Sequence, residues 1–235
     1  MTKLGMVGGT GPESTLMYYR EIAVRFQKRH PNGAFPALTI ETVNMYEMLG
    51  YAKSGDFDAL ERYLGGAVRN LEAAGAELVI LTANVAHVVF DRLQRNTRTP
   101  LLSILEPTCQ EINKRSLGRI ALIGTGFTMS QPYFKEAFFA QGIEAVVPNA
   151  EERAVIDDII ARELEFGIVN ESSKALVDAI IDRLIAEEGA QGVVLGCTEL
   201  PLMYGEALLP APVFDTMQLH IESIVDRMLE ESREG

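Results

Sequence analysis

A cysteine in the segment Gly196-Cys-Thr-Glu199 is the side chain best suited to chemistry in this sequence. Cys197 comes directly after the apolar run 192–195, where a buried strand would end and the next segment would begin. At the N-terminus of a helix the pKa of a thiol falls, which favours the reactive thiolate. We therefore predict a reactive thiol at Cys197, with Glu199 orienting it, tuning its charge or capping the turn. The alternative is a small buried hydrophobic residue.

Polar side chains at other expected strand ends could bind a small polar ligand. Asn84 and Thr198 follow Ala83 and Cys197 at matching places, and Thr128 adds a hydroxyl at a third strand end. Paired polar groups at two such ends suit the two ends of a small polar ligand, and the alternative for each is a helix cap. His87 could be a general base, although a structural role is favoured for it.

The segment Gly8-Gly-Thr-Gly-Pro-Glu-Ser-Thr15 follows the first expected strand and opens a helix. Its backbone N–H groups, around Thr10, could hold a phosphate or a carboxylate. As a dinucleotide fingerprint it fits poorly, because the third glycine position is Ser14 and the nearest strand-end acid, Glu41, lies too far along the chain. A carboxylate cradle or a structural tight turn is the favoured interpretation.

Short apolar runs alternate with longer amphipathic segments, and these elements must position the polar groups. Strands are expected at 4–7, 37–43, 78–81, 101–104, 120–123, 144–147, 192–195 and 213–214, with helices such as 15–29, 56–74 and 172–188 between them. Short strands separated by helices predict an α/β fold with parallel sheets buried on both faces. Ligands of such sheets bind at the carboxyl ends of the strands.

An internal repeat divides the chain into two similar halves. Residues 75–84 resemble 189–198, 9–11 resemble 124–126, and 99–102 resemble 211–214, all at nearly one offset. The repeat predicts two α/β lobes related by a pseudo-twofold axis, with the active site in the cleft between them. We place residues 1–97 and 211–235 in the first lobe and 98–210 in the second.

The composition excludes several classes of protein. The chain is 47% hydrophobic with ordinary Gly and Pro usage, as in a folded globular protein. Its net charge of -12 argues against nucleic acid and anionic membranes as partners. Two cysteines make no disulfide framework, three histidines offer little for a zinc site, and Cys109 lies in an expected core helix. With no signal peptide or membrane-spanning run apparent, we expect a cytoplasmic protein that needs no metal.

Four segments resemble the aspartate/glutamate racemase family, the cofactor-independent amino-acid racemases. They are 8–15, 84–87, 124–129 and 196–199, spread over most of the chain. The segment 124–129 is most similar to the aspartate racemases and the broad-specificity amino-acid racemases. The resemblance implies a homodimer of two-lobed chains and a reaction without pyridoxal phosphate. In that reaction a thiolate removes the substrate α-proton, and an opposing thiol delivers a proton to the other face.

By this resemblance Cys197 is one of the two catalytic thiols, and Ala83 stands where the family has the other. A methyl group cannot carry a proton, so we expect a natural one-base form or an inactivated variant. Thr82 is the neighbouring hydroxyl, but adjacent strand residues point to opposite sides. The residues that the resemblance assigns to substrate binding are Thr10, Asn84, Val85, Thr128 and Thr198, with His87 and Glu199 in support.

The expected activity is that of an amino-acid racemase, an isomerase acting on aspartate and/or glutamate. Aspartate racemases carry an Arg and a Lys that grip the side-chain carboxylate, and the matching positions here are Met48 and Glu165. Arg162 or Lys53 could substitute, and the choice between acidic and neutral amino acids stays open. The alternatives are a one-cysteine decarboxylase or isomerase of the same superfamily, such as the arylmalonate decarboxylases, and a non-catalytic amino-acid-binding protein.

Overall fold

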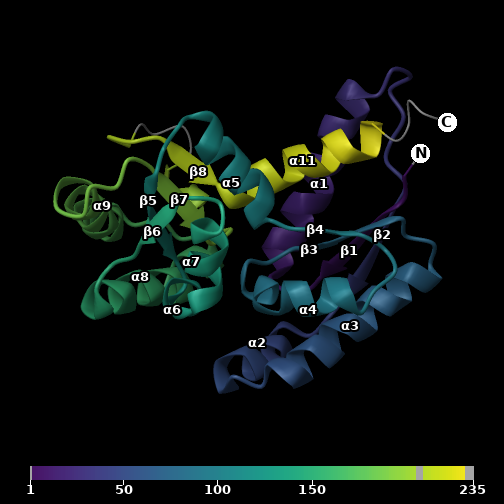
Figure 1. The fold of residues 1–235 in the computed structure, drawn as a ribbon, viewed down its shortest axis with the longest axis horizontal. Coiled ribbons are helices and arrows are strands. Elements are labelled where there is room, and N and C mark those ends of the chain that lie inside the picture. Colours follow the sequence, from purple (N-terminus) through teal and green to yellow (C-terminus); the bar gives the residue numbers. More distant parts are fainter. Residues whose placement is uncertain (1, 205–208, 231–235) are drawn as a thin grey trace. The chain divides into compact units, whose positions relative to one another are not determined.

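The computed structural model describes residues 2–204 and 209–230 (Figure 1). These residues form two compact units, which we call the first unit and the second unit. The first unit contains residues up to 104 together with the segment that begins at His220, and the second contains residues 105–219. Each unit has a four-stranded sheet of its own in the described part of the chain. The α/β class with two lobes is therefore confirmed.

The first sheet consists of β1 (Leu4–Gly8), β2 (Leu38–Thr42), β3 (Leu78–Leu81) and β4 (Leu101–Leu102). All pairs are parallel and the order is β2-β1-β3-β4. The central strands β1 and β3 are buried along their whole length, as apolar runs of a sheet covered on both faces should be. Because Val7 pairs with Leu81, the loop after β1 and the loop after β3 begin side by side.

The helices of the first unit are capped and patterned as their sequences require. They are α1 (Pro12–Arg29), α2 (Met45–Ser54), α3 (Phe57–Ala73), the 3-10 helix η1 (Val85–Val89), α4 (Phe90–Arg95) and the part of α11 (Thr216–Glu230) that follows residue 219. The Asn44 side chain accepts from the first N–H groups of α2, and Asp56 caps α3 in the same way. Helix α3 then buries a stripe at helical spacing that includes Leu60, Leu64 and Leu71.

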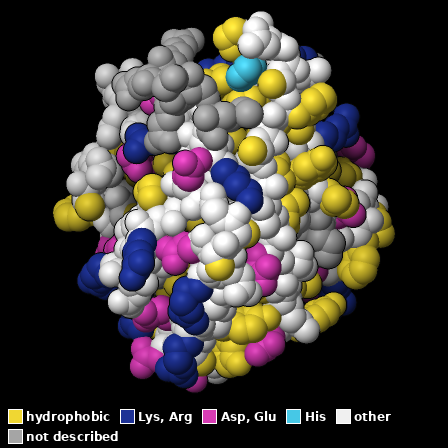
Figure 2. Space-filling model, turned by 90° about the vertical axis from the view of Figure 1, so that its right-hand side faces the viewer, with side chains coloured by type: hydrophobic (Ala, Val, Ile, Leu, Met, Phe, Trp, Pro, Cys, Tyr) yellow, Lys and Arg dark blue, Asp and Glu magenta, His cyan; other side chains and the backbone are white. Residues whose placement is uncertain are grey.

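Hydrogen bonds and ion pairs join helix α11 to α1 inside the first unit. His220 of α11 is fully buried and accepts from the Tyr18 hydroxyl at Nδ1 over 2.9 Å. At the surface, Arg29 of α1 forms ion pairs with Glu222 at 2.6 Å and with Asp226. Basic and acidic side chains are interspersed on the face that Figure 2 shows, with hydrophobic side chains between them. The C-terminal helix is therefore part of the first unit's core rather than an appendage.

The second sheet repeats the topology of the first. Its strands are β5 (Arg119–Gly124), β6 (Glu144–Val146), β7 (Val193–Gly196) and β8 (Val213–Asp215), all parallel, in the order β6-β5-β7-β8. When the strands of each unit are numbered in chain order, both sheets have the spatial order second, first, third and fourth. Gly124 pairs with Gly196, so the loops after β5 and β7 also begin side by side. The internal repeat in the sequence thus corresponds to a repeated sheet.

The helices of the second unit are α5 (Leu105–Lys114), α6 (Gly126–Ser130), α7 (Pro132–Phe139), α8 (Ala150–Arg162), η2 (Leu164–Phe166), α9 (Glu171–Ala186) and the short α10 (Pro201–Tyr204). Asn149 and Glu152 cap the start of α8 with a reciprocal capping box. Apolar residues of α8, α9 and α10 pack with β5 and β7 in one hydrophobic cluster that includes Cys197. Among the described residues, no helix is both long enough and apolar enough to cross a lipid bilayer.

The units divide later along the chain than the sequence predicted. We expected the lobes to change at 97/98 and 210/211, whereas the units change at 104/105 and 219/220. Strand β4 belongs to the first unit because it pairs with β3, and β8 belongs to the second because it pairs with β7. Each crossing therefore falls after the fourth strand of a sheet.

Candidate active site

Close packing of two strand ends sets the position of Cys197. A Cβ atom on Gly196 would lie 3.1 Å from the Ile123 carbonyl oxygen and 3.1 Å from Cγ2 of Thr128. A Cβ atom on Gly124 would lie 2.9 Å from the Gly196 carbonyl oxygen. Glycine at both positions therefore lets β5 and β7 end in contact. Cys197 follows directly, at the carboxyl edge where the sequence placed it.

Glu199 and Cys197, two residues apart, are in direct contact. The Cys197 thiol donates to Oε2 of Glu199 over 2.9 Å, and the Thr198 hydroxyl donates to the same oxygen over 2.8 Å. The cysteine itself is 7% exposed. One carboxylate oxygen thus orients both neighbouring side chains, and a proton acceptor stands in contact with sulfur.

The electrostatic surroundings raise the pKa of Cys197 well above its ordinary value. Burial of the thiol is the largest cause, followed by the negative charge and the hydrogen bond of Glu199, and Glu165 raises it further. The prediction of a pKa lowered by a helix N-terminus is therefore wrong. Helix α10 begins only at Pro201, and it is a single turn long. The raised pKa favours the protonated thiol.

Thr128, the other polar residue predicted at this edge, lies beside the cap of α6. It is 1% exposed, and its hydroxyl lies 3.1 Å from that of Thr125. Thr125 is the N-cap, because its hydroxyl oxygen accepts from the Thr128 N–H over 3.2 Å. Thr125 was not singled out in the sequence, although threonine is among the residues preferred at the N-cap of a helix.

At the matching edge of the first unit, hydroxyl groups join the loop after β1 to the end of β3. Thr82 is fully buried and donates to the Val7 carbonyl oxygen over 3.0 Å. Its single proton is then in use, so the Thr10 hydroxyl, 3.0 Å away, donates to it. The Ser14 hydroxyl donates to the Thr82 carbonyl oxygen over 2.7 Å. The Thr82 hydroxyl is therefore held in structural hydrogen bonds.

The tight turn after β1 requires its glycine. Gly9 has a φ of 73°, and a Cβ atom there would lie 2.4 Å from the Val43 carbonyl oxygen. The Gly9 N–H donates to the Thr15 hydroxyl over 3.0 Å. The glycine-rich segment is thus folded back on itself by local geometry, in agreement with the tight turn that the sequence allowed.

Ala83 and Asn84 follow Thr82, and His87 holds the turn that they form. The His87 ring is fully buried, donates from Nδ1 to the Ala83 carbonyl oxygen over 2.9 Å, and accepts at Nε2 from the Ile104 N–H over 3.1 Å. Burial lowers its pKa to about 4. Both ring nitrogens are engaged, which fits the structural role favoured for this residue. Asn84, 5% exposed, immediately precedes η1, whose first residue is Val85.

The two positions matched to substrate-gripping basic residues have different surroundings. Met48 is fully buried in the first unit, whereas Glu165 is an exposed residue of η2. The Met48 thioether carries no charge, so it cannot pair with a substrate carboxylate as an arginine or a lysine would. Glu165 lies close enough to Cys197 to affect the pKa of the thiol.

Helix α10, which follows the Cys197 turn, is held by side chains that the sequence did not single out. The Lys174 ammonium lies 5.2 Å from the centre of the Tyr204 ring and 2.6 Å from a carboxylate oxygen of Asp178. Lys174 and Asp178 are one helical turn apart on α9, a spacing that is common on exposed helices and gave no distinct signal. These contacts join α9 to the end of α10.

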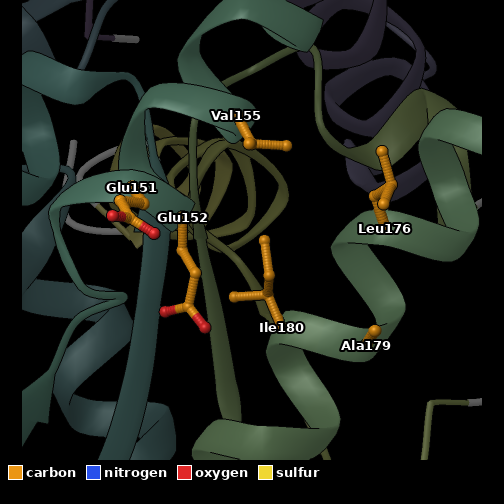
Figure 3. Close-up of a pocket in the computed structure, with 6 residues that line it drawn as sticks. All are labelled: Glu151, Glu152, Val155, Leu176, Ala179 and Ile180. Carbon is orange, nitrogen blue, oxygen red and sulfur yellow. The ribbon is translucent and has the colours of Figure 1, made fainter.

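A cavity of about 340 Å³ lies elsewhere in the second unit, between α8 and α9. Figure 3 shows Glu151, Glu152 and Val155 on one of its sides and Leu176, Ala179 and Ile180 on the other. None of these residues was predicted to do chemistry, and Glu152 is bound to Arg183 at 2.6 Å. Within the described residues, no three His, Cys, Asp or Glu side chains come together as metal ligands. The strand-end residues therefore remain the best candidates for chemistry.

A family model described as Asp/Glu/hydantoin racemase matches residues 7–224 of the chain. The chain belongs to this family. It is 24% identical to a broad-specificity amino-acid racemase of Bacillus subtilis (strain 168), over 96% of this chain and 98% of that one. Family membership confirms the resemblance on which the sequence-based site assignment rests.

Two solved structures extend the comparison to the fold. An aspartate racemase homologue from Pyrococcus horikoshii OT3 is 35% identical, with a TM-score of 0.85 over 97% of this chain and 99% of that one. A Yersinia pestis protein named as a candidate Asp/Glu racemase is 31% identical, with a TM-score of 0.90 over 97% and 100%. The two-lobed α/β architecture of this chain is thus that of racemase-family proteins.

Proposed function

We propose that this protein is an amino-acid racemase-family enzyme that exchanges the α-proton of an amino acid through Cys197, without pyridoxal phosphate. The hydrogen bond from the Cys197 thiol to Glu199, at the carboxyl end of β7, is the observation that carries the proposal. It joins the one thiol at a strand end to a proton acceptor. Family membership supports the reaction class.

The chemistry begins with a protonated thiol. Glu199 takes the proton from Sγ, and the resulting thiolate removes the substrate α-proton, so that the S–H bond is restored as the C–H bond breaks. The electron pair left on Cα is delocalised into the substrate carboxylate. While the carbanion persists, the proton on sulfur exchanges with solvent. In the return step the thiol gives a solvent-derived proton to Cα, and Glu199 gives its proton back to the thiolate. Glu199 thus supplies the proton acceptor that the buried thiol needs, although its negative charge also raises the pKa of Cys197.

The substrate carboxylate needs hydrogen-bond donors, because its negative charge grows as the α-proton leaves. We assign this role to Thr10, Asn84, Val85, Thr128 and Thr198, as the resemblance implies. The Thr198 hydroxyl is bound to Glu199 over 2.8 Å and would exchange that partner for the substrate. His87 holds the turn that contains Asn84 through its hydrogen bonds to Ala83 and Ile104, and it takes no part in proton transfer.

Ala83 restricts the reaction to one face of the substrate. Its methyl group carries no exchangeable proton. The Thr82 hydroxyl beside it is fully buried and forms hydrogen bonds with Val7 and Thr10. We therefore assign Thr82 a structural role. The expected result is exchange with retention of configuration on one enantiomer, with little inversion.

The test is incubation of the protein in D2O with the L- and D-forms of single amino acids, beginning with aspartate, glutamate and their amides. Proton NMR follows loss of the α-proton, and chiral chromatography follows configuration. Exchange with retention on one enantiomer supports the proposal. If the protein binds one or more of these amino acids but exchanges the α-proton of none, the proposal is contradicted. That result indicates a non-catalytic amino-acid-binding protein.

A second candidate is a one-thiol decarboxylase of malonate-like acids. A single protonated thiol is the state needed to deliver a proton to a carbanion that loss of carbon dioxide has produced. Release of carbon dioxide from a substituted malonate, with incorporation of one solvent deuteron, would favour this candidate. Exchange of amino-acid α-protons without such release would favour the racemase-type reaction.

A further inference from the structure

A groove runs between α8 and α9 of the second unit. It consists of the cavity of about 340 Å³ described above and a second cavity of about 440 Å³. Val155 of α8 and Leu176 of α9 line both cavities, so the two adjoin and form what we call the α8–α9 groove. The described side chains that line it all belong to the second unit, and none of them is a strand-end residue. The groove is therefore separate from the candidate active site.

The middle of the α8–α9 groove is apolar and accessible to solvent. Val155 is 38% exposed and Leu176 is 55% exposed. Figure 3 shows Val155 and Ile180 directed into the space between the two helices. An aliphatic ligand in the groove would remove this apolar surface from water, which is favourable.

The charged side chains that line the groove, among the residues that the structure describes, are all acidic. They are Glu151, Glu152, Asp158 and Glu163. Glu152 pairs with Arg183 at 2.6 Å, and Asp158 pairs with Arg162 at 2.6 Å. The charges of these two carboxylates are thus already compensated by arginine.

The other two carboxylates, Glu151 and Glu163, lie at opposite ends of α8. Neither forms an ion pair with a residue that the structure describes. At about 1.5 Å per residue they are about 18 Å apart along the helix axis. A single ligand that pairs with both must therefore be elongated and carry a cationic group at each end.

The Glu163 carboxylate lacks a hydrogen-bond donor. Its Oε1 atom accepts from the hydroxyl of Ser173, a residue 8% exposed, over 2.8 Å. Its Oε2 atom is buried and has no hydrogen-bond partner among the described residues. A buried carboxylate oxygen without a donor costs free energy. An ammonium group in the adjoining cavity would supply the donor, because the last torsion of a glutamate side chain is broad and lets the oxygen turn toward it.

We propose that the α8–α9 groove binds an elongated aliphatic amine with an ammonium group at each end. One ammonium group binds Glu163 and gives it the missing donor, and the other binds Glu151 at the far end of the groove. The aliphatic chain between them lies on Val155 and Leu176. This site is independent of proton transfer at Cys197.

Three amines test the proposal on the unchanged protein: 1,12-diaminododecane, spermine and 1,4-diaminobutane. The first two have equally long chains between their terminal nitrogens, and the third is too short to reach both carboxylates. Calorimetry at physiological salt measures the three dissociation constants. We expect 1,12-diaminododecane to bind at least about tenfold more tightly than 1,4-diaminobutane, because only the long chain reaches both ends and covers the apolar surface. Spermine should fall between them, since its inner ammonium groups would lie against that surface.

The variant Glu163→Gln removes the charge at the buried end of the groove. We expect it to weaken the binding of 1,12-diaminododecane by about tenfold, because a charge-assisted hydrogen bond is lost. Asp182→Asn is the matched control. It removes a carboxylate from an exposed position of α9 that lines neither cavity, and it should leave the dissociation constant unchanged.

A second pair of variants tests the apolar part of the groove. Leu176→Lys places a cation between the two ends and should abolish binding of the diamine. Phe139→Lys makes a comparable change at an exposed position of α7 and should alter binding little. Thermal unfolding establishes that each variant is folded, and Glu163→Gln decides the question if Leu176→Lys is not.

The outcomes that overturn this inference are distinct from those that overturn the proposed function. Absence of binding by 1,12-diaminododecane overturns it. Equal dissociation constants for the long and the short diamine also overturn it, because they indicate only attraction of cations to an acidic protein. Equal weakening by Glu163→Gln and Asp182→Asn has the same meaning. Exchange of α-protons in D2O is measured separately, so either proposal can fail without the other.

Discussion

The carboxyl edges of the two sheets have the same topology and different chemistry. In the first unit, the residues after β3 are Thr82 and Ala83, and the hydroxyl there is fixed in hydrogen bonds to Val7 and Thr10. In the second unit, the residues after β7 are Cys197 and Thr198, whose side chains share one carboxylate oxygen. A repeated fold provides two equivalent places for an acid–base group, but only the second is filled by a side chain that can exchange a proton.

Replacing Cys197 gives the largest expected effect on this comparison. Cys197→Ala should reduce α-proton exchange by about a thousandfold or more, because the thiol that removes the α-proton is lost. The measurement is deuterium incorporation at Cα by proton NMR. Cys109→Ala is the matched control, since Cys109 is a buried residue of α5 and should be dispensable for exchange. Equal losses in both variants would contradict the assignment.

Removing the charge from Glu199 should have the next largest effect. Glu199→Gln should slow exchange by about a hundredfold, because the acceptor of the thiol proton is lost. The Glu199 carboxylate raises the pKa of Cys197 through its charge and hydrogen bond, so the amide should lower that pKa while burial continues to hold it up. Ultraviolet absorbance of the thiolate, followed across pH, measures this shift. A Cys197 pKa that does not fall would show that Glu199 acts only as a structural cap.

Placing a thiol at position 83 of the first unit makes the carboxyl edges of the two sheets alike. Ala83→Cys should increase the rate of inversion relative to exchange by about tenfold or more, since the second face of the substrate then has a proton donor. Chiral chromatography of the product in water and deuterium counting in D2O separate inversion from exchange. Thr82→Val tests the alternative, and a loss of inversion in that variant would assign the missing role to the Thr82 hydroxyl.

The buried histidines of the first unit predict a smaller effect, on stability and not on chemistry. Burial lowers the pKa of His87 to about 4 and that of His220 to about 3, while each would be near 6.5 in the unfolded chain. Below pH 6.5 the unfolded state therefore binds more protons, and stability falls as the pH decreases toward those values. Each histidine should contribute a loss of about 2 kcal/mol between pH 7 and pH 5.

Denaturant unfolding at several pH values measures this loss. His220→Gln should flatten the dependence of unfolding free energy on pH, even if the variant is less stable at every pH. His30→Gln, which replaces a histidine outside the buried pair, serves as the control for the substitution itself. An unchanged slope in His220→Gln would mean that other groups control acid stability.

The sequence was sufficient for the elements and for the candidate residues. Apolar runs predicted the strands of both sheets, because a parallel strand covered on both faces must be apolar along its length. The repeat predicted two similar lobes, and the strand-end segments drew attention to Cys197, Asn84 and Thr128. We did not predict the change of lobes after β4 and after β8, because which sheet a short strand joins depends on its pairing. The likeness of residues 99–102 to 211–214 was the signal in the sequence that these two strands hold equivalent places.

Tertiary structure decided the state of each group. The sequence by itself established that a thiol and a carboxylate lie two residues apart, and that an alanine stands at the matching place. The raised pKa of Cys197 and the structural hydrogen bonds of Thr82 followed only from the fold. Burial, and the partners that distant strands bring within hydrogen-bond distance, determine protonation. The burial that raises the pKa of Cys197 and the partners of Thr82 both involve residues far apart in the chain, although Glu199 is a neighbour of the cysteine. Local sequence could therefore name the groups but could not assign their charge.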